Sequence, residues 1–285
     1  MNMDTPILEA VNLHYRYPDG TCALNGVNLR VQRGEKLAVM GANGSGKSTF
    51  FLCLNGVHQP SDGTVYLDGE PVRYTAKGLM DLRRRVGIVF QDPEHQLFSA
   101  DVYGEISFGP MNLGLAEYEV RNRVEGIIRE MGITPFQDKP VHFLSGGQKK
   151  RVSIADILVM EPDVVMLDEP AAALDPKHAE LVDKIIDGLS DKGITVIQST
   201  HDVDRAFAWA DQVALFHEGK VLVKDTPAVV FGNVALLREV NLKQPAVLKL
   251  FYSLISWGML DGNLPLPRSV DELTVYIEQA APKQV

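Results

Sequence analysis

Cysteine is scarce in this chain: Cys22 and Cys53 are the only two among its 285 residues. Two thiols are too few for a disulfide framework or a thiolate zinc site, and they suit a reducing compartment. The seven histidines are scattered, and no two of them have a ligand spacing such as i, i+4. The sequence therefore does not predict a metal site made entirely of protein side chains.

The chain also lacks an excess of positive charge. It has 28 Lys and Arg against 37 Asp and Glu, which gives a net charge of −9 and a pI of about 5.3. A nucleic-acid partner is therefore not expected. The two tight basic runs, 83–85 and 149–151, are short, and we interpret them as solvated helix faces.

No apolar run approaches the roughly 20 residues that a membrane span needs. The longest candidate, VLKLFYSLISWGML at 247–260, is shorter and contains Lys249. The first residues, MNMDTPILEAVN, have neither the basic nor the apolar region of a signal peptide. We expect a chain that is soluble by itself and still able to dock onto a membrane partner.

What the chain does have is 45% hydrophobic residues, enough for a packed core. Before residue 41, ILEAVNL and VNLRV alternate apolar and polar residues, which predicts an antiparallel side sheet. Later apolar runs such as KLAVM and ITVIQS alternate with helical patterns, which predicts an α/β fold with a mainly parallel sheet between helices. The pattern is helical from about 92 to 160, and again after Pro245.

The segment GANGSGKST fits the phosphate-binding pattern G-x-x-x-x-G-K-[ST] between a predicted strand and a predicted helix. That context disfavours the alternative of a simple glycine-rich turn. Lys47 is expected to reach the β- and γ-phosphates of a nucleotide, and Ser48 to ligate Mg²⁺. The predicted nucleotide-binding residues of this P-loop are Gly41, Ala42, Asn43, Gly44, Ser45, Gly46, Lys47, Ser48 and Thr49.

Two acidic residues, Asp168 and Glu169, end the apolar strand of VVMLDEP, at the sheet edge where ligands bind in such folds. Asp168 is predicted to hold Mg²⁺, and Glu169 to polarise the attacking water. The alternative is that either carboxylate only caps the next helix. That role suits Asp175 better, because Asp175 directly precedes Pro176.

Two further polar residues end predicted strands. His201 follows ITVIQST and is predicted to donate to a γ-phosphate, although it could instead cap the helix DVDRAFAWA. Gln91 ends RVGIVFQ, where its amide is predicted to touch Mg²⁺ or the attacking water. His201 or Gln91 alone would be weak evidence for a nucleotide site, but the P-loop in the same chain favours the functional interpretation of both.

A second phosphate-binding pattern lies about a hundred residues after the P-loop, in LSGGQ at 144–148. Its residues Ser145, Gly146, Gly147 and Gln148 are small or polar and open a predicted helix. Free backbone N–H groups at a helix N-terminus point at negative charge, so this segment is a candidate anion site.

Together these motifs resemble the ATP-binding-cassette (ABC) ATPases in order and approximate spacing, over residues 6–240. LSGGQ resembles that family's signature motif, and Tyr17 resembles its adenine-stacking aromatic, with a surface tyrosine as the alternative. The resemblance implies ATP and Mg²⁺, a nucleotide-binding role for Asp175, and a P-loop NTPase core with an antiparallel side sheet and an inserted helical subdomain. We expect an ATP-binding domain over 1–240 and a helical domain over 241–285.

The resemblance also explains the second anion site. In this family two cassettes dimerise head to tail, so that LSGGQ of one covers the ATP held by the P-loop of the other. The expected partner is therefore a second copy of the same chain. Hydrolysis is expected because every catalytic motif is present, which opposes the alternative of an ATP-binding scaffold without activity.

A narrower resemblance covers residues 91–115 and the tail from Pro245, which look like the ATPase subunits of energy-coupling-factor importers, especially those for cobalt or nickel. It implies a position on the cytoplasmic face of the membrane, with a transmembrane scaffold subunit and a substrate-capture subunit as partners. Other transporter ATPases and soluble cassette ATPases are the alternatives. Five apolar residues are predicted to line the scaffold groove or the subdomain core: Leu97, Phe98, Val102, Ile106 and Phe108.

Overall fold

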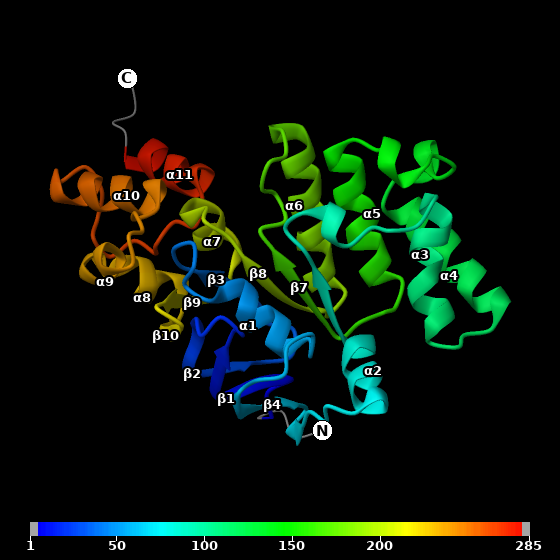
Figure 1. Cartoon of the computed structure of the whole chain (residues 1–285). Helices are drawn as coiled ribbons and strands as arrows, with labels where there is room; N and C mark the ends of the chain where they lie inside the picture. The colour runs from blue at the N-terminus through cyan, green and yellow to red at the C-terminus, as the bar shows by residue number, and fades with distance from the viewer. Residues whose placement is uncertain (1–4, 281–285) are drawn as a thin grey trace.

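A computed structural model describes residues 5–280 (Figure 1). Residues 1–4 of the predicted ATP-binding domain and residues 281–285 of the predicted helical domain lie outside the described part. Its strands are β1 (Leu8–Arg16), β2 (Cys22–Val31), β3 (Lys36–Met40), β4 (Asp62–Leu67), β5 (Glu70–Pro71), β6 (Val86–Val89), β7 (Val164–Asp168), β8 (Thr195–Ser199), β9 (Gln212–His217) and β10 (Lys220–Asp225). Its helices are α1 (Lys47–Leu54), α2 (Ala76–Arg85), α3 (Val102–Asn112), α4 (Glu117–Glu130), α5 (Gly146–Leu158), α6 (Pro176–Asp191), α7 (Val203–Trp209), α8 (Pro227–Gly232), α9 (Val234–Glu239), α10 (Ala246–Ser256) and α11 (Val270–Ala280). Three short 3₁₀ helices are η1 (Pro93–His95), η2 (Thr134–Phe136) and η3 (Val141–Phe143).

The central sheet has the strand order β10-β9-β3-β8-β7-β6 and is parallel except for the antiparallel β9–β10 hairpin. Strands β7 and β8 are buried along their whole length, as expected for a sheet covered on both faces. The parallel register aligns their last residues, so that Asp168 pairs with Ser199. The predicted α/β architecture is therefore confirmed, and the carboxyl ends of β3, β6, β7 and β8 meet at one edge.

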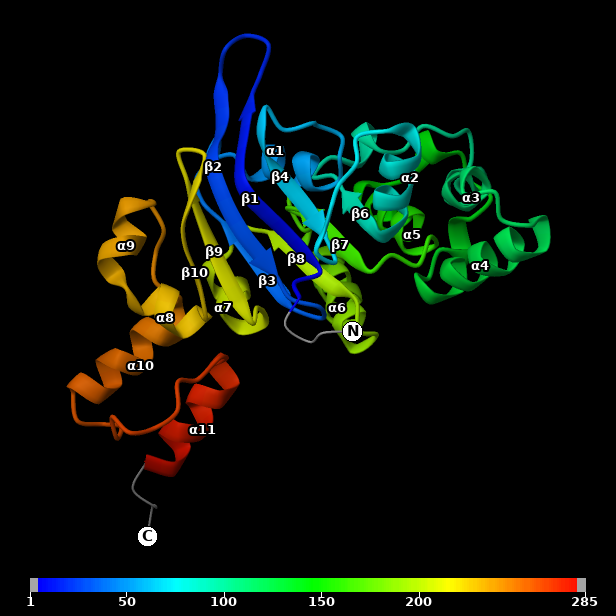
Figure 2. The same ribbon diagram turned by 90° about the horizontal axis from the view of Figure 1, so that it is seen from below.

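The predicted side sheet is also present, with antiparallel strands in the order β2-β1-β4-β5. Helix α1 contributes Phe50 and Phe51 to an apolar cluster that also contains residues of both sheets, such as Leu24 and Phe216. Figure 2 shows the side sheet in front of the central sheet, with the helical subdomain on one side and the C-terminal helices on the other. Because α1 begins directly after the P-loop, this packing fixes the loop against both sheets.

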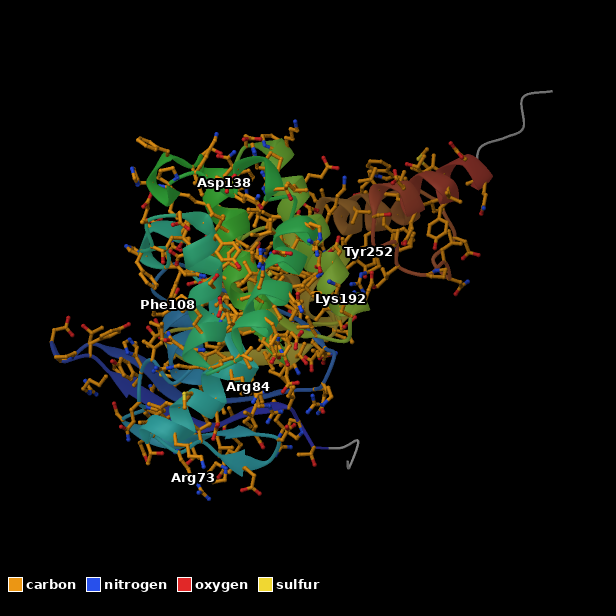
Figure 3. All side chains as sticks on the ribbon, turned by 90° about the vertical axis from the view of Figure 1, so that its right-hand side faces the viewer. Arg73, Arg84, Phe108, Asp138, Lys192 and Tyr252 are labelled. Carbon is orange, nitrogen blue, oxygen red and sulfur yellow. The ribbon has the colours of Figure 1, made fainter. Side chains whose placement is uncertain are left out.

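The helical subdomain contains α3, α4 and the 3₁₀ turns η2 and η3, and α5 connects it to the central sheet (Figure 1). Three of the five residues predicted to line a partner groove, Leu97, Val102 and Ile106, are buried in its core. They are thus core residues, and only Phe98 and Phe108 are exposed, with their rings in edge contact. Figure 3 shows Phe108 on the outer face of the subdomain.

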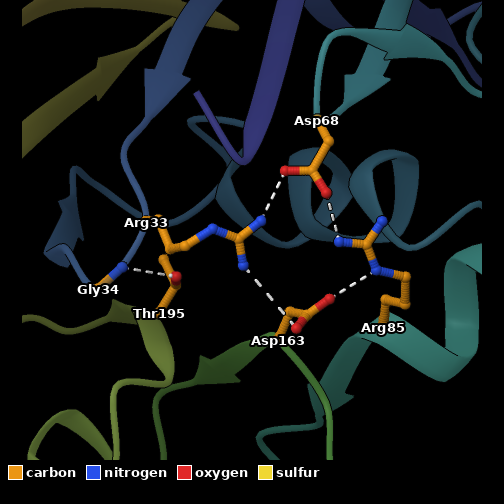
Figure 4. Close-up of polar contacts among 6 residues, drawn as sticks. All are labelled: Arg33, Gly34, Asp68, Arg85, Asp163 and Thr195. Carbon is orange, nitrogen blue, oxygen red and sulfur yellow. Dashed lines mark hydrogen bonds and ion pairs between the residues drawn. The ribbon is translucent and has the colours of Figure 1, made fainter. Parts of the chain in front are cut away.

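The prediction that both basic runs are solvated helix faces is correct only in part. The first run ends α2, where Arg83 and Arg84 are exposed and Arg85 is half-buried, and Figure 3 shows Arg84 at the surface. Arg83 donates to the carbonyl of Gly56 at 2.9 Å. Arg85 contacts Asp68 and Asp163, each at 2.5 Å, and Arg33 reaches the same two carboxylates (Figure 4). These alternating charges join the side sheet to the amino end of β7.

The two C-terminal helices lie beside α7, α8 and α9, on the side of the molecule away from α3 and α4 (Figures 1 and 2). The predicted break between them at 261–267 is confirmed. Leu248 and Phe251 of α10 are buried in the same apolar cluster as Phe231 of α8, so the core continues into this unit. Within residues 5–280, no helix is long and apolar enough to cross a membrane.

Candidate active site

The P-loop connects β3 to α1 and wraps tightly around its own lysine. A Cβ atom at Gly41 would lie 2.2 Å from the carbonyl oxygen of Phe216, and one at Gly46 would lie 2.6 Å from that of Ala23. Both glycines also have positive φ angles, 150° and 104°. Only residues without a side chain fit at these two positions, which is the reason for the glycine spacing of the motif.

Lys47 is buried and folds back on the loop, donating to the carbonyls of Gly41 at 2.8 Å and Ala42 at 3.1 Å. Burial lowers the pKa of Lys47, and the nearby carboxylates of Glu169 and Asp168 act in the opposite direction. The hydroxyl of Ser45 is buried without a hydrogen-bond partner. The loop therefore holds one cation and one unpaired donor where an anion could bind.

The two acidic residues after β7 are linked through Ser199 at the end of β8. The Ser199 hydroxyl donates to Oδ1 of Asp168 at 2.5 Å and accepts from the backbone N–H of Glu169 at 2.9 Å. Glu169 has a φ of 43°, a left-handed conformation that is unusual for this residue type. The sequence reading missed Ser199, although its place opposite Asp168 follows from the parallel register.

His201 contacts Glu169 directly: its Nε2 lies 2.5 Å from Oε1 of the carboxylate. The alternative that His201 caps α7 is wrong, because Asp202 is the N-cap and accepts from the N–H of Arg205. The strand ends therefore bring Asp168, Glu169 and His201 together at the sheet edge beside the P-loop.

Tyr17 lies over the outer end of the P-loop, where its hydroxyl group is 2.9 Å from Oγ1 of Thr49. Its ring is in edge contact with Tyr15 and His58, and those two rings stack on each other 4.6 Å apart. The aromatic group predicted at a nucleobase is thus held in place by two neighbouring rings.

LSGGQ opens α5 through a capping box between Ser145 and Gln148, whose side chains each accept from the other's backbone N–H. A Cβ atom at Gly147 would lie 2.3 Å from the ring of His178, whereas one at Gly146 would meet nothing within 4 Å. Asp175 caps α6 and also contacts the His178 ring, at 2.5 Å. The N-termini of α5 and α6 therefore lie side by side.

Two cavities meet at Gln91, which is exposed between them. The first is lined by the P-loop together with Tyr17 and Glu169, and none of its lining residues comes from 144–148. The second contains Gly146, Lys150 and Asp168. Six of the nine P-loop residues therefore share one cavity with Tyr17, Gln91 and Glu169, whereas Gly146 of LSGGQ lines the other.

Lys150 belongs to the second basic run and is almost completely buried, with 1% of its surface exposed. Burial lowers the pKa of Lys150 to about 8, although the carboxylates of Asp92 and Asp168 oppose the shift. Its neighbour Lys149 pairs with Glu94, and Arg151 lies over the ring of Phe136. The burial of Lys150 could not be predicted from the basic run, because the groups that Lys150 contacts lie about sixty residues away in the sequence.

A P-loop after β3, two carboxylates at the carboxyl end of β7 and a histidine after the intervening strand β8 define a P-loop nucleoside triphosphatase. Comparisons with known proteins narrow this class. Residues 24–172 match the ABC transporter family. The energy-coupling factor transporter ATP-binding protein EcfA of Methanocaldococcus jannaschii is 45% identical over 265 residues, 90% of this chain and 95% of that protein.

Solved structures agree with this match. CbiO1 from Clostridium perfringens, described as part of the ABC transporter complex CbiONQ, superposes with a TM-score of 0.73 and is 44% identical, over 89% of this chain and all of that one. A dimeric ATP-binding cassette bound to ADP and Pi superposes with a TM-score of 0.70 at 27% identity, over 77% of this chain and 98% of that one. The chain belongs to the ABC transporter family and is an ATPase of that family, as the motifs predicted.

Proposed function

We propose that this chain is the ATP-hydrolysing subunit of an energy-coupling-factor importer for cobalt or nickel ions, bound to the cytoplasmic face of the membrane. The observation that carries the proposal is the extent of the similarity to EcfA. It covers 90% of this chain, beyond the residues 24–172 that match the family in general. The CbiO1 structure supports the same group.

In this proposal the P-loop residues 41–49 hold the triphosphate, and Tyr17 stacks on the adenine. The buried cation of Lys47, the unpaired hydroxyl of Ser45 and the glycine-only cradle fit an anion of this kind. Ser48, Asp168 and Gln91 would hold Mg²⁺, which would neutralise negative charge on the phosphates. A hydroxyl, a carboxylate and an amide are oxygen donors that this ion accepts.

Glu169 is the group that orients and deprotonates the attacking water, because it lines the P-loop cavity and its backbone is fixed by Ser199. His201 is placed to move between Glu169 and a γ-phosphate. No residue of 144–148 lines the P-loop cavity, which supports a site completed by a second copy of this chain. There, Ser145, Gly146, Gly147 and Gln148 would bind the γ-phosphate at the N-terminus of α5. Asp175, between the two helix N-termini, is proposed to lie at the same interface.

The membrane partner is proposed to dock on the helical subdomain. Phe98 and Phe108 form an exposed aromatic pair. Tyr103 and Met111 are exposed on α3, the helix that contains Phe108. A cavity between α3 and α4 contains Tyr103 and Met111. An apolar surface of this kind on an otherwise acidic protein suits an apolar helix end of a scaffold subunit.

The test is transport by the assembled complex. The chain would be expressed with the membrane proteins encoded beside its gene, and uptake of radioactive cobalt and nickel measured in the presence of ATP. We expect uptake of one ion, abolished by Glu169→Gln in this chain. ATP-dependent uptake of a vitamin by the same complex, with no metal uptake, would replace the ion assignment. ATPase activity with no membrane partner would overturn the importer assignment.

A further inference from the structure

Within the described residues, the ammonium group of Lys150 makes its only hydrogen bonds to the backbone that follows β6. Its Nζ donates to the carbonyl of Phe90 at 2.8 Å and to that of Gln91 at 2.7 Å. The ladder between β6 and β7 ends at Val89, so neither carbonyl has a strand partner. One side chain therefore satisfies the two backbone acceptors at which the chain leaves the sheet.

This arrangement is unusual for a lysine. Lysine is almost never fully buried unless it is paired with an acid. Across residues 5–280 no carboxylate lies within ion-pair distance of Lys150, and the acids whose charges act on it are those of Asp92 and Asp168. Burying an unpaired cation costs free energy, and two carbonyl groups offset that cost only in part. The side chain is thus poorly explained as a contribution to stability alone.

Lys150 lies between the two parts of the proposed ATP site, LSGGQ at the start of α5 and the P-loop cavity. It lies four residues after Gly146, so the two share one face of α5 and line the same cavity. Gln91 lies at the boundary between that cavity and the one that contains Lys47 and Glu169. Because Gln91 belongs to no helix or strand, its bond to Lys150 is the contact that fixes its backbone carbonyl.

A second contact ties the same segment to α5. The amide of Gln96 donates to the carbonyl of Ser153 at 2.7 Å and accepts from the N–H of Phe90 at 3.3 Å. The segment 90–96 is therefore attached to α5 at both ends, by Lys150 and by Gln96, and a displacement of α5 must carry Gln91 with it.

We propose that Lys150 is a positioning residue for ATP hydrolysis, which holds the Gln91 backbone to the first turns of α5 so that Gln91 and LSGGQ move as one body. The inference rests on the role proposed above for Gln91. Gln91 then reaches the Mg²⁺ site only when α5 is correctly placed against the central sheet. The position of α5, the helix that LSGGQ opens, would therefore be coupled to the geometry of the hydrolytic site within one subunit.

The test compares Lys150→Met with Lys184→Met. Both remove a lysine charge from a helix, but Lys184 makes only an exposed ion pair within α6, with Glu180. We expect kcat for ATP hydrolysis to fall about ten- to a hundredfold in Lys150→Met, the scale for misplacing a catalytic group by about 1 Å. The Kd of a non-hydrolysable ATP analogue should stay within about twofold, because no P-loop contact changes. Lys184→Met should hydrolyse ATP like the wild type.

A double-mutant cycle then asks whether Lys150 acts through Gln91. In a Gln91→Ala background, Lys150→Met should lower kcat no further. An equal fractional loss in both backgrounds, or wild-type kcat in Lys150→Met, would overturn the inference while leaving the proposed function intact. Wild-type kcat in Gln91→Ala alone would overturn both this inference and the role proposed for Gln91. If Lys150→Met does not fold, Lys150→Gln, which keeps one donor group without the charge, replaces it in the same cycle.

Discussion

Gly146→Asp is the sharpest test of a shared ATP site, and the structure selects it over its neighbour. At Gly147 a Cβ atom would lie 2.3 Å from the ring of His178 in the same chain, so a substitution there disturbs the subunit itself. At Gly146 a Cβ atom meets nothing within 4 Å. A loss of activity in Gly146→Asp therefore reports on what a second copy brings to this surface.

The substitution should act with opposite signs on stability and on hydrolysis. Within one chain, an aspartate in the first turn of α5 interacts favourably with the helix dipole, by about 0.3–1 kcal/mol. In a shared site the carboxylate would instead face a γ-phosphate, and two unit charges about 4 Å apart repel by about 4 kcal/mol at an effective dielectric constant of about 20. Closure of the dimer should weaken by roughly a thousandfold.

The assays are the thermal midpoint of the nucleotide-free chain, binding of a non-hydrolysable ATP analogue, and phosphate release. We expect an equal or higher midpoint, unchanged binding, and hydrolysis reduced by at least a hundredfold. Gly126→Asp in α4 is the matched control, because a Cβ atom at Gly126 also meets nothing within 4 Å. It should hydrolyse ATP like the wild type.

Mixing two inactive variants separates a shared site from a site within one chain. Gly146→Asp leaves the P-loop intact, and Lys47→Ala leaves LSGGQ intact. A mixed dimer would contain one complete site, formed by the P-loop of the first and the LSGGQ of the second. Recovery of hydrolysis on mixing is expected. A mixture with no more activity than its components, in samples shown by crosslinking to contain mixed dimers, would refute the reasoning.

Other variants test the remaining assignments. Glu169→Gln should keep ATP binding and lower hydrolysis roughly a hundredfold or more, with an ATP-trapped dimer visible by gel filtration; wild-type turnover would exclude Glu169 as the base. Lys47→Ala should weaken binding of a non-hydrolysable ATP analogue in isothermal titration, and unchanged affinity would mean that the P-loop is not the nucleotide site. Phe251→Ala should lower the free energy of unfolding by about 3–5 kcal/mol in urea titrations, because Phe251 belongs to the main core; a change below about 1 kcal/mol would mean that the tail folds separately. Trp257→Ala should loosen the nucleotide-free dimer in analytical ultracentrifugation if the exposed apolar side of the tail is a second dimer contact.

The parts of the site that the sequence could predict are those fixed by local pattern and by sheet geometry. Asp168 and His201 follow apolar strands, and parallel strands bring such residues to one edge. Asp175 was predictable as a helix cap from the proline after it, and the cap is present.

What could not be predicted depends on contacts between distant segments. Lys150 and Arg85 both belong to short basic runs, and a run by itself suggests solvent. Their actual environments are set by the carbonyls of Phe90 and Gln91 and by Asp68 and Asp163, which come from other parts of the chain. Charge pattern reports composition along the chain, whereas burial of a charge depends on partners in space.

The contact between His201 and Glu169 bears on how the proposed site would be activated. His201 Nε2 lies against Oε1 of the carboxylate that is proposed to accept a proton from water. Glu169 also has a left-handed backbone conformation, and its N–H donates to the Ser199 hydroxyl. For Glu169 to act as the proposed base, His201 would have to leave this oxygen for another acceptor. A γ-phosphate covered by LSGGQ of a second copy would be such an acceptor, and in that case dimer closure on ATP would also release the base.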